Sequence, residues 1–520
     1  MAADETSVDA LFRHFGPSYR WFITFNVMIG AIAMGLASSI VNVAVPAVMG
    51  AYGVGLDQAQ WISIGFLGTM SVTMLLSSWL LEAFGQRVTY IGTLIVFIVG
   101  SLLSASAQSI DMMVVGRVLQ GAASGVGQPL AMYAIYQVFP TDRRGMAMGL
   151  YGLGTVLAPT FGPVLGGLAI DTLSWRYLFL LPLPFCAPAL LLSTILMPSK
   201  KISRPFPTFD WTGLILMFIA TFSLLAGLSN GPRWGWGSNE ILLLLLGGGG
   251  GGTVAFIFWE LRASYPMLDL SLFRNRSFAL TMLAGFVFGA GLFSSSYFIP
   301  VFVQTVQSYN ATRAGMLLAP GGMVMILFFP LAGRITDSIP AHIPIATGLM
   351  IFSVSLFLIS VVDVNTTFWA LVGFTLITRV GLSLAIPSLS VAALRAVPPN
   401  KISRGASSST FIRNLGGGFG IALLTAFFQH RSRHHGDALT ATQTAANTTT
   451  AELIGEVRDL LGSAGFPSQD QTAGALSYLS SIIQAQANTL GFQDTFLAIS
   501  VVAFLAAGPA WLIGHRPPQS

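Results

Sequence analysis

Three arginines stand inside strongly apolar stretches of this sequence. Arg117 lies in GRVLQGAASG, Arg379 in TRVGLSLAIP and Arg413 in IRNLGGGFG. An arginine at the centre of a membrane helix costs about 2.5 to 3.5 kcal/mol, so such residues face a bundle interior or a watery cavity and usually carry function. The alternative is a guanidinium that snorkels to the surface or anchors a loop. We treat all three, with Gln120 beside Arg117, as candidate transport or coupling residues.

The composition indicates that these arginines belong to a membrane protein. Of the 520 residues, 53% are hydrophobic and 9% are charged, whereas a soluble domain has roughly 25% charged residues. The net charge of +5 does not indicate nucleic acid, because Lys and Arg occur in short clusters between apolar runs rather than on one basic module. We therefore predict an all-α polytopic membrane protein that contacts the lipid bilayer and no nucleic acid.

The sequence lacks the motifs of enzymes and of resident cofactors. It holds no HExxH, nucleophile elbow, Walker A sequence or paired cysteines, and its one cysteine lies in an apolar segment. The glycines of LGGGGGGTVAF match a dinucleotide fingerprint trivially, but the residues on both sides are equally apolar. We predict no enzymatic activity, no cofactor and no metal site.

Apolar runs long enough to cross a bilayer recur along the chain. A hydrocarbon core of about 30 Å needs about 20 helical residues. The runs predict about fourteen membrane helices, near residues 21–45, 59–81, 88–107, 112–138, 145–169, 176–197, 211–229, 240–261, 278–303, 314–336, 342–362, 367–394, 405–428 and 492–514. Lys and Arg gather after the even-numbered spans, which predicts that those loops and both termini are cytoplasmic.

One connection, residues 429–491, is long and polar and is expected on the outer side. Leu453, Val457 and Leu460 mark one helical face, Leu476 and Ile482 mark another, and the turn sequence GFP separates them. We predict two short amphipathic helices here. They either cap the outer rim of the protein or form a docking surface for a periplasmic partner.

Polar motifs recur in the two halves of the chain. SSWLLEAFGQR, GRVLQGAASG and PTDRRG correspond in order to GRITD, TRVGLSLAIP and PPNKISRG, about 260 residues later. Parallel repeats of this kind predict two six-helix bundles with two extra helices between them. The expected division is a tail at 1–20, the first bundle at 21–199, the intervening helices at 200–270, the second bundle at 271–514 and a tail at 515–520.

Small residues and prolines dominate the fifth predicted span. GLGTVLAPTFGPVLGG lets neighbouring backbones approach closely, and its prolines remove hydrogen bonds and permit a bend. We interpret this span as a mobile gate helix, with plain packing as the alternative. Its residues are Gly154, Pro159, Gly162, Pro163, Gly166 and Gly167. In the first span, Asn42 of SIVNVAVP is either a hydrogen-bonding group in a cavity or a structural bond between helices.

Taken in order, these motifs resemble the major facilitator superfamily. RVLQGAASG resembles its fourth-helix motif, APTFGPVLGG the fifth-helix motif of its drug exporters, and LLEAFGQR a degraded form of its loop motif. SIVNVAVP and YPMLDLSLFRNRSF are similar to stretches of fourteen-span drug:proton antiporters of the EmrB/QacA type. The resemblance implies the major facilitator fold. It also implies roles for Glu82, Gly85 and Arg87 of the loop motif and for Gly333 and Asp337 in the second half.

The sequence departs from this resemblance at one functional position. Such exporters carry an aspartate near the start of the first-helix motif, and an intramembrane carboxylate there couples proton entry to substrate exit, whereas the matching residue here is Ala37. The other acids and the histidines map to span ends, loops or tails. A cavity with arginines and no buried acid disfavours a lipophilic cation, because nothing central compensates its charge, and it tolerates neutral or anionic amphiphiles.

The predicted function is export of small lipophilic drugs or toxic amphiphiles across an inner membrane by alternating access, with proton linkage left open by Ala37. The resemblance implies a periplasmic membrane-fusion adaptor and an outer-membrane channel as partners. The alternatives are a uniporter, a weak-acid or metabolite exporter without side-chain proton coupling, or a receptor or scaffold that moves no solute. The expected cavity residues, for which packing is the alternative role, are Trp61, Gln128, Tyr133, Tyr297, Phe298 and Gln304.

Overall fold

The computed structural model describes residues 7–54, 56–59, 61–199, 208–234, 239–444 and 447–513, and these residues form helices without a strand. The expected tail at 515–520 lies outside this part of the chain, as do the first six residues of the expected tail at 1–20 and residues 200–207 of the intervening segment. Ser, Thr or Asn caps many helix N-termini, as Ser109 does where its Oγ accepts the Met112 N–H at 3.3 Å.

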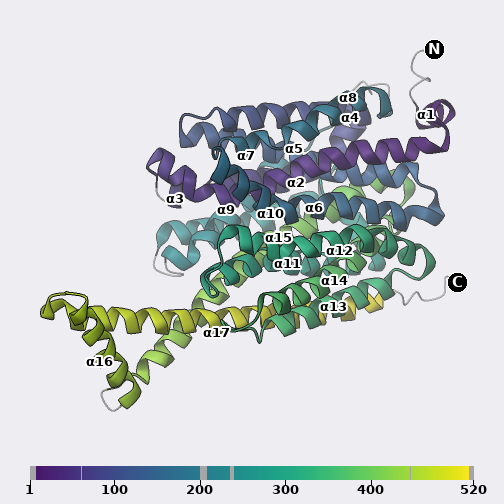
Figure 1. Cartoon of the computed structure of the whole chain (residues 1–520). Coiled ribbons are helices and arrows are strands. Elements are labelled where there is room, and N and C mark those ends of the chain that lie inside the picture. Colours follow the sequence, from purple (N-terminus) through teal and green to yellow (C-terminus); the bar gives the residue numbers. More distant parts are fainter. Residues whose placement is uncertain are drawn as a thin grey trace.

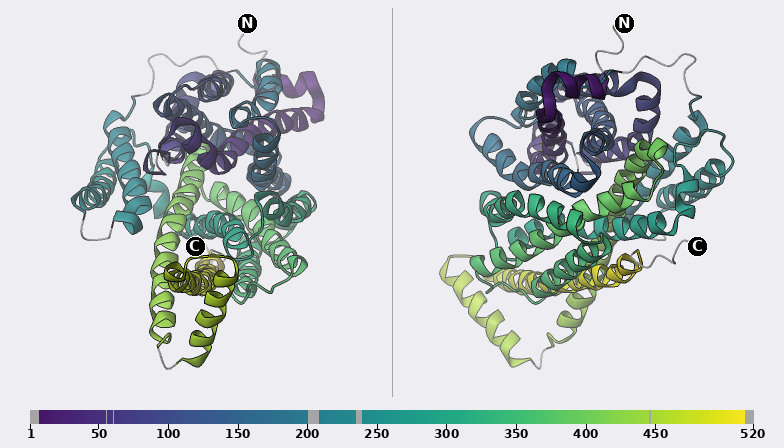
Figure 2. Two further views of the ribbon diagram at one scale, coloured as in Figure 1. Left: turned by 60° about the vertical axis from the view of Figure 1, so that its left-hand side comes forward. Right: turned by 90° about the vertical axis from the view of Figure 1, so that its right-hand side faces the viewer.

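The helices form two bundles and a lateral pair (Figures 1 and 2). The first bundle contains α1 Val8–Phe15, α2 Tyr19–Tyr52, α3 Leu56–Ala59, α4 Trp61–Ala105, α5 Ile110–Val138, α6 Arg144–Thr172, α7 Tyr177–Leu180 and α8 Leu183–Leu196. The lateral pair is α9 Trp211–Trp234 and α10 Glu240–Glu260. The second bundle contains α11 Arg276–Thr305, α12 Ala311–Ser338, α13 His342–Ile359, α14 Phe368–Arg395, α15 Ile402–Ala441, α16 Thr448–Ser463 and α17 Ser468–Leu512.

The predicted number of membrane spans is reproduced. Eleven of the described helices are long and apolar enough to cross a membrane. One of them, α4, has 45 residues and breaks at Gly85, whose φ of 76° and ψ of 174° suit only glycine, so it covers two predicted spans. Helices α5 and α6 are not among the eleven, but each has 29 residues and occupies a predicted span. Each of the fourteen predicted spans is thus occupied by a helix, and the predicted all-α fold class is confirmed.

The two bundles repeat one glycine-mediated helix contact. A Cβ added to Gly100 of α4 would lie 2.8 Å from the Gly116 carbonyl oxygen of α5. In the second bundle, a Cβ added to Gly348 of α13 would lie 2.8 Å from the Gly381 carbonyl oxygen of α14. Glycine at these positions lets the paired backbones touch. The sequence repeat therefore corresponds to a repeat in packing.

The two ends of the bundles differ. Helix α1 and the last turn of α17 lie at one end, which we call the terminal face (Figure 1). From the opposite end, the hairpin face, a projection of α15, α16 and α17 extends well beyond the other helices (Figure 1). At 40 and 45 residues, α15 and α17 are roughly 60 and 68 Å long, about twice the thickness of a hydrocarbon core.

The projection corrects one prediction. The first amphipathic helix is α16, and Gly465, with a φ of 84°, makes the turn after it. The second is not a short separate helix, because Leu476 and Ile482 lie within continuous α17. Its sequence between 468 and 491 is rich in helix-forming Ala, Gln and Leu and contains no proline, so nothing ends the helix before the membrane.

The lateral pair lies beside the junction of the two bundles (Figure 2, left). Helix α9 contacts α4 of the first bundle and α15 of the second. A Cβ on Gly68 would lie 2.7 Å from the Phe222 ring, and one on Gly418 would lie 3.2 Å from a Leu225 methyl group. The extra helices therefore pack against both halves of the protein.

Candidate functional site: the junction between the two bundles

A carboxylate of the second bundle caps a helix of the first. Asp337, near the end of α12, accepts the Gly145 N–H at 2.6 Å and the Met146 N–H at 3.0 Å. These are the first free amides of α6, where the helix dipole favours an anion. A Cβ on Gly333 would come within 2.6 Å of the Gly145 carbonyl oxygen, so glycines allow the approach. Asp337 thus joins the bundles at the terminal face.

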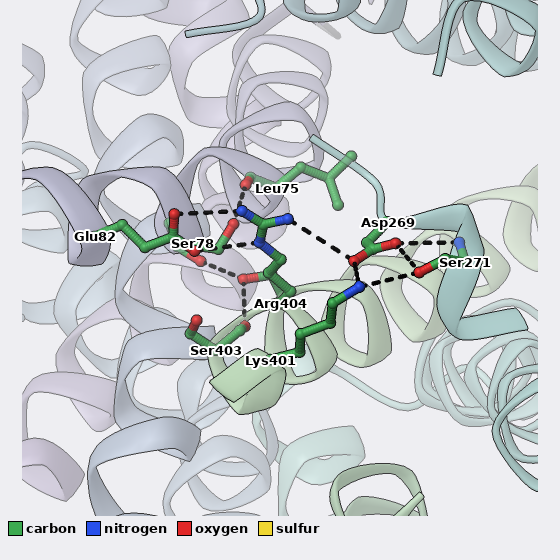
Figure 3. Close-up of polar contacts among 10 residues, drawn as sticks. Leu75, Ser78, Glu82, Asp269, Ser271, Lys401, Ser403 and Arg404 are labelled. Carbon is green, nitrogen blue, oxygen red and sulfur yellow. Dashed lines mark hydrogen bonds and ion pairs between the residues drawn. The ribbon is translucent and has the colours of Figure 1, made fainter. Parts of the chain in front are cut away.

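An ion cluster makes a second junction at the same face (Figure 3). Arg404 of α15 donates through Nε to Glu82 Oε1 of α4 at 3.2 Å, and its Nη1 lies 3.8 Å from Asp269 Oδ2. Lys401 donates to the same Asp269 oxygen at 2.7 Å and to Ser271 Oγ at 3.1 Å. We call Glu82, Asp269, Lys401 and Arg404 the ion cluster. It ties both bundles to the segment that follows α10.

Deeper along the junction, polar side chains meet across the bundles by long hydrogen bonds. Asn414 of α15 donates to Gln128 Oε1 of α5 at 3.5 Å, and Arg413 donates to the Tyr151 hydroxyl of α6 at 3.5 Å. Closer to the terminal face, the Ser77 and Ser407 hydroxyls pair at 2.7 Å. Bonds of 3.5 Å are weak. Arg413 and Gln128 are therefore held only weakly by their partners across the junction.

These cross-bundle contacts share one location. Every hydrogen bond and ion pair that joins the bundles among the described residues involves the half of each helix nearest the terminal face. At the hairpin face, the apolar cluster that includes Leu36, Ile62 and Phe179 draws only on first-bundle helices. Among the described residues, polar contacts therefore join the two bundles at the terminal face.

Arg117 is bound entirely within the first bundle. It is 1% exposed. Its Nη1 donates to Gln120 Oε1 at 2.7 Å, its Nε donates to the Ile62 carbonyl oxygen at 3.3 Å, and its guanidinium lies 4.1 Å from the centre of the Phe66 ring. Gln120 in turn donates to Ser101 Oγ at 2.7 Å. The guanidinium charge is thus compensated by a closed network rather than left for a ligand.

Arg379, the repeat counterpart of Arg117, lacks such a network. It is 4% exposed, and no hydrogen bond or ion pair joins its side chain to any residue that the structure describes. The residue three positions on is Leu382, where the first bundle has Gln120. A Cβ on Gly321 of α12 would lie 2.8 Å from Arg379 Cγ. The side chain therefore lies directly against α12 with its charge uncompensated.

The remaining predicted residues fall into three groups. The loop-motif residue Arg87 donates to the Met197 carbonyl oxygen at 2.8 Å, within the first bundle. The gate-helix glycines Gly154, Gly162 and Gly166 face Met28, Ser39 and Ile40 of α2, whereas Gly167 faces open space. The side chains of Asn42, Pro159 and Pro163 lie outside the described residues.

The predicted cavity residues do not form one group. Gln128 lies in the junction, and Tyr133 is half-buried on the same helix. Trp61, Tyr297 and Gln304 are exposed. Phe298 is buried in an aromatic cluster of the second bundle, with ring centres 6.1 Å from Phe428 and 6.2 Å from Phe492. Only Gln128 is placed where it meets both bundles.

An apolar groove opens between α2, α6 and α8 of the first bundle. Its volume is about 580 Å³, and Phe25, Met28, Leu150 and Leu192 are among its lining residues. The hydroxyl of Thr24, its polar lining residue, is already bonded to the Arg20 carbonyl oxygen at 2.6 Å. The groove therefore presents hydrocarbon to the membrane near the terminal face.

Comparison with known proteins identifies the fold that these contacts serve. The profile of the Major Facilitator Superfamily matches residues 27–421. The chain belongs to this superfamily. The multidrug export protein EmrB of Haemophilus influenzae is 27% identical over 485 residues and 93% of each chain. The multidrug transporter protein MdtP of Bacillus subtilis is 30% identical over 416 residues, which are 80% of this chain and 76% of its own.

Two further similarities extend over nearly the whole facilitator. The fatty acid resistance protein FarB of Neisseria gonorrhoeae is 26% identical over 512 residues, 97% of each chain. Among solved structures, the human organic anion transporter MFSD10 superposes with a TM-score of 0.58 at 14% identity, covering 93% of this chain and 99% of its own. The structural likeness shows the fold. The motif resemblance to the major facilitator superfamily is thereby confirmed.

Some residues of the junction in this facilitator were not among the sequence candidates. Asp269, Arg404, Tyr151 and Asn414 all make cross-element contacts there. Their positions within apolar helices or short loops do not show which distant residue they meet. The one available signal was charge complementarity between two motifs, since Glu82 stands in SSWLLEAFGQR of the first half and Arg404 in PPNKISRG of the second.

The carboxylate of Asp269 in the ion cluster is expected to stay ionised near neutrality. Burial raises the pKa of Asp269, but hydrogen bonds from Lys401 and Ser271 lower it by more, so the net pKa lies below the usual 3.8. Such a carboxylate stabilises the folded state above its unfolded pKa, and this contribution is lost as the pH falls through the folded pKa. The difference in unfolding temperature between wild type and Asp269→Asn should stay constant between about pH 5 and 8. Thermal unfolding in detergent measures it, and a difference that shrinks near pH 6 would contradict the assignment.

Proposed function

We propose that this facilitator exports lipophilic neutral or weakly acidic compounds by alternating access, with the terminal face in the cytoplasm. The observation that carries the proposal is the confinement of the cross-bundle polar contacts to the terminal face. Two bundles fastened at one end only can rock about a central solute site, and breaking the Asp337 and Arg404 contacts would permit the opposite opening. In this reading the described conformation faces outward.

The buried charges support the substrate class. Among the described residues, Arg379 is buried without a hydrogen-bond or ion-pair partner, and the side chain of Arg413 has only a long bond to Tyr151. Isolated buried charges are costly unless something compensates them. A carboxylate on an amphiphilic solute would do so, whereas a lipophilic cation would add to the repulsion. The names of two relatives, a multidrug export protein and a fatty acid resistance protein, agree with lipophilic cargo.

The apolar groove supports entry from the membrane. Its lining of Phe25, Met28, Leu150 and Leu192 lies between α2, α6 and α8 near the terminal face. A solute dissolved in the adjacent leaflet would reach α6, which we propose as the gate helix, without crossing water. Binding of the hydrocarbon part of the solute in such a groove follows from the burial of apolar surface.

The energy source and the partners complete the proposal. Export is proton-linked, and the protein works in an inner membrane with its hairpin projection in the periplasm. The projection, built from α15, α16 and α17, carries exposed Leu460, Phe466, Leu476 and Tyr478. These side chains suit a periplasmic membrane-fusion adaptor that leads to an outer-membrane channel. The alternative without coupling, a uniporter for weak acids, differs by showing no dependence on the pH gradient.

The proposal predicts discrimination by charge. Proteoliposomes should export dodecanoate and its methyl ester but not dodecyltrimethylammonium. Arg379→Gln should lower dodecanoate export about 10- to 100-fold, because a hydrogen bond to a charged group contributes about 1.5 to 3 kcal/mol. Export of the methyl ester should change little. The assay is initial-rate efflux of each labelled compound.

A matched control separates this effect from general damage. Arg262→Gln removes an exposed arginine that stacks on Phe258 at 3.8 Å, and it should leave all three rates unchanged. Robust export of the quaternary ammonium compound, with none of the acid or ester, would refute the assigned substrate class.

A further inference from the structure

Two carboxylates lie close together at the start of α9 and the end of α10, the two helices of the lateral pair. Asp210 directly precedes α9, and Glu260 is the last residue of α10. Glu260 is 3% exposed, and Asp210 is half-buried. Neither forms an ion pair with a residue that the structure describes. Within the described part of the chain, each carboxylate therefore has the other as a neighbouring negative charge.

Each carboxylate has one oxygen that is satisfied and one that is not. Asp210 Oδ1 accepts the Gly213 N–H and the Trp259 indole N–H, both at 2.8 Å. Glu260 Oε2 accepts the Leu268 N–H at 3.2 Å. The other two oxygens, Asp210 Oδ2 and Glu260 Oε1, are buried and accept no hydrogen bond from the described residues. Two buried acceptors without a donor are costly.

The two unsatisfied oxygens face the same point. A Cβ on Gly213 would lie within 3.0 Å of both Asp210 Oδ2 and Glu260 Oε1, so the oxygens are at most about 6 Å apart. Two ionised carboxylates this close repel each other strongly in a buried site. A single proton removes one charge and supplies the missing donor. Glycine at position 213 keeps the space between the oxygens free of a side chain.

A small cavity connects Asp210 of this pair to Glu82 and Arg404 of the ion cluster. Its volume is about 30 Å³, enough for water, and Asp210, Glu82, Arg404 and Trp79 are among its lining residues. Asp269 acts on Glu260 as a further negative charge from the segment after α10. Among the described residues, the charged groups around the pair are thus Glu82 from α4, Asp269 from that segment, Lys401 directly before α15, and Arg404 from α15.

We propose that Asp210 and Glu260 share one proton and form the proton-binding site of this transporter. Glu260 is the protonated member, as a carboxylic acid whose O–H points toward Asp210 Oδ2 directly or through one water. The site stands in for the intramembrane acid that Ala37 replaces. The inference rests on the proposed proton-linked export and names the group that carries the proton.

The cavity suggests how the proton would act on the junction. On release, the Glu260 O–H passes its proton to Asp210 Oδ2, and Asp210 passes it to water in the cavity. The pair then carries a second negative charge next to the cavity that Arg404 also lines. That charge competes with Glu82, whose oxygen lies 3.2 Å from Arg404 Nε. Weakening the Glu82–Arg404 pair loosens the terminal face. Rebinding of a proton restores the pair and favours closure.

Infrared difference spectroscopy tests the site without any substrate. At neutral pH the wild type should show a band from the carbonyl stretch of a protonated carboxyl group. This band should be lost in Glu260→Gln. It should also be lost in Asp210→Asn, because the asparagine amide can donate to Glu260 Oε1 and leave that group ionised. Glu240→Gln, at the exposed start of α10, is the matched control and should keep the band.

A transport assay is the second test of the proton site. In proteoliposomes, Glu260→Gln should lose the dependence of dodecanoate efflux on the pH gradient while retaining downhill exchange. A wild-type spectrum without the band, or a band that persists in Glu260→Gln, overturns the proton site. A wild type that shows the band but moves neither acid nor ester instead overturns the proposed function, so the two failures are distinguishable.

Discussion

Asp337→Ala is expected to open the terminal face and to abolish most transport while the protein remains folded. The substitution removes the acceptor of the Gly145 and Met146 amides and the partner of Arg395 at 3.9 Å. A hydrogen bond to a charged group contributes about 1.5 to 3 kcal/mol, so the closed terminal face should lose about 3 kcal/mol, or roughly a hundredfold in population. A transporter that cannot close the terminal face should therefore complete its transport cycle slowly.

Distance measurements between spin labels check this expectation. Thr141→Cys, just before α6, and Ser338→Cys, at the end of α12, are exposed sites on either side of the contact. The native Cys186 is buried and should not take the label. Asp142→Ala is the control, because that acid is exposed and pairs only with neighbouring Arg143 at 3.7 Å. If Asp337→Ala kept the wild-type distance distribution, the helix cap would have no part in closure.

Gln120→Leu is expected to destabilise the first bundle more than a typical core substitution. It removes the 2.7 Å acceptor of Arg117 Nη1 and leaves a buried charge with only the Ile62 carbonyl oxygen and the Phe66 ring. Taking a hydrogen-bond acceptor away from a buried charged group costs about 3 kcal/mol or more. The unfolding free energy in mixed micelles measures the loss.

The double variant Arg117→Leu/Gln120→Leu supplies the decisive comparison. It removes the charge together with its acceptor, so most of the lost stability should return, to within about 1 kcal/mol of wild type. Gln304→Leu, at an exposed position of α11, should have little effect. A double variant less stable than Gln120→Leu would show that Arg117 stabilises the bundle by contacts other than this pair.

The contrast between Arg117 and Arg379 shows which properties of the candidate site could be predicted from the sequence and which could not. Their motifs mark both as intramembrane arginines and as repeat counterparts. Whether the charge of each arginine is compensated depends on the residue three positions later in the chain, which is Gln120 after Arg117 and Leu382 after Arg379. It also depends on whether a neighbouring helix supplies a carbonyl oxygen. The neighbouring helix is fixed only by packing. The sequence therefore predicted the pair but not the difference between its members.

The proton carrier illustrates the same limit. Glu260 stands at a span end in the sequence and looks like an ordinary surface acid. Its burial and its unsatisfied oxygen beside Asp210, 50 residues earlier in the numbering, arise from the pairing of α9 with α10. A search for acids at the membrane midplane does not find such a pair, because its members become neighbours only in three dimensions.

By itself the sequence determined the class of protein, the fourteen spans, the superfamily and the repeat. These follow from hydrophobic runs, charge placement and local motifs, all of which act within about one helix length. The tertiary structure alone decided that Asp337 caps α6, that Arg404 pairs with Glu82, that α17 runs unbroken into the projection, and which acids lie together. Each of these depends on contacts between segments far apart in the chain. The energies of such contacts depend on distance and burial as well as on residue type.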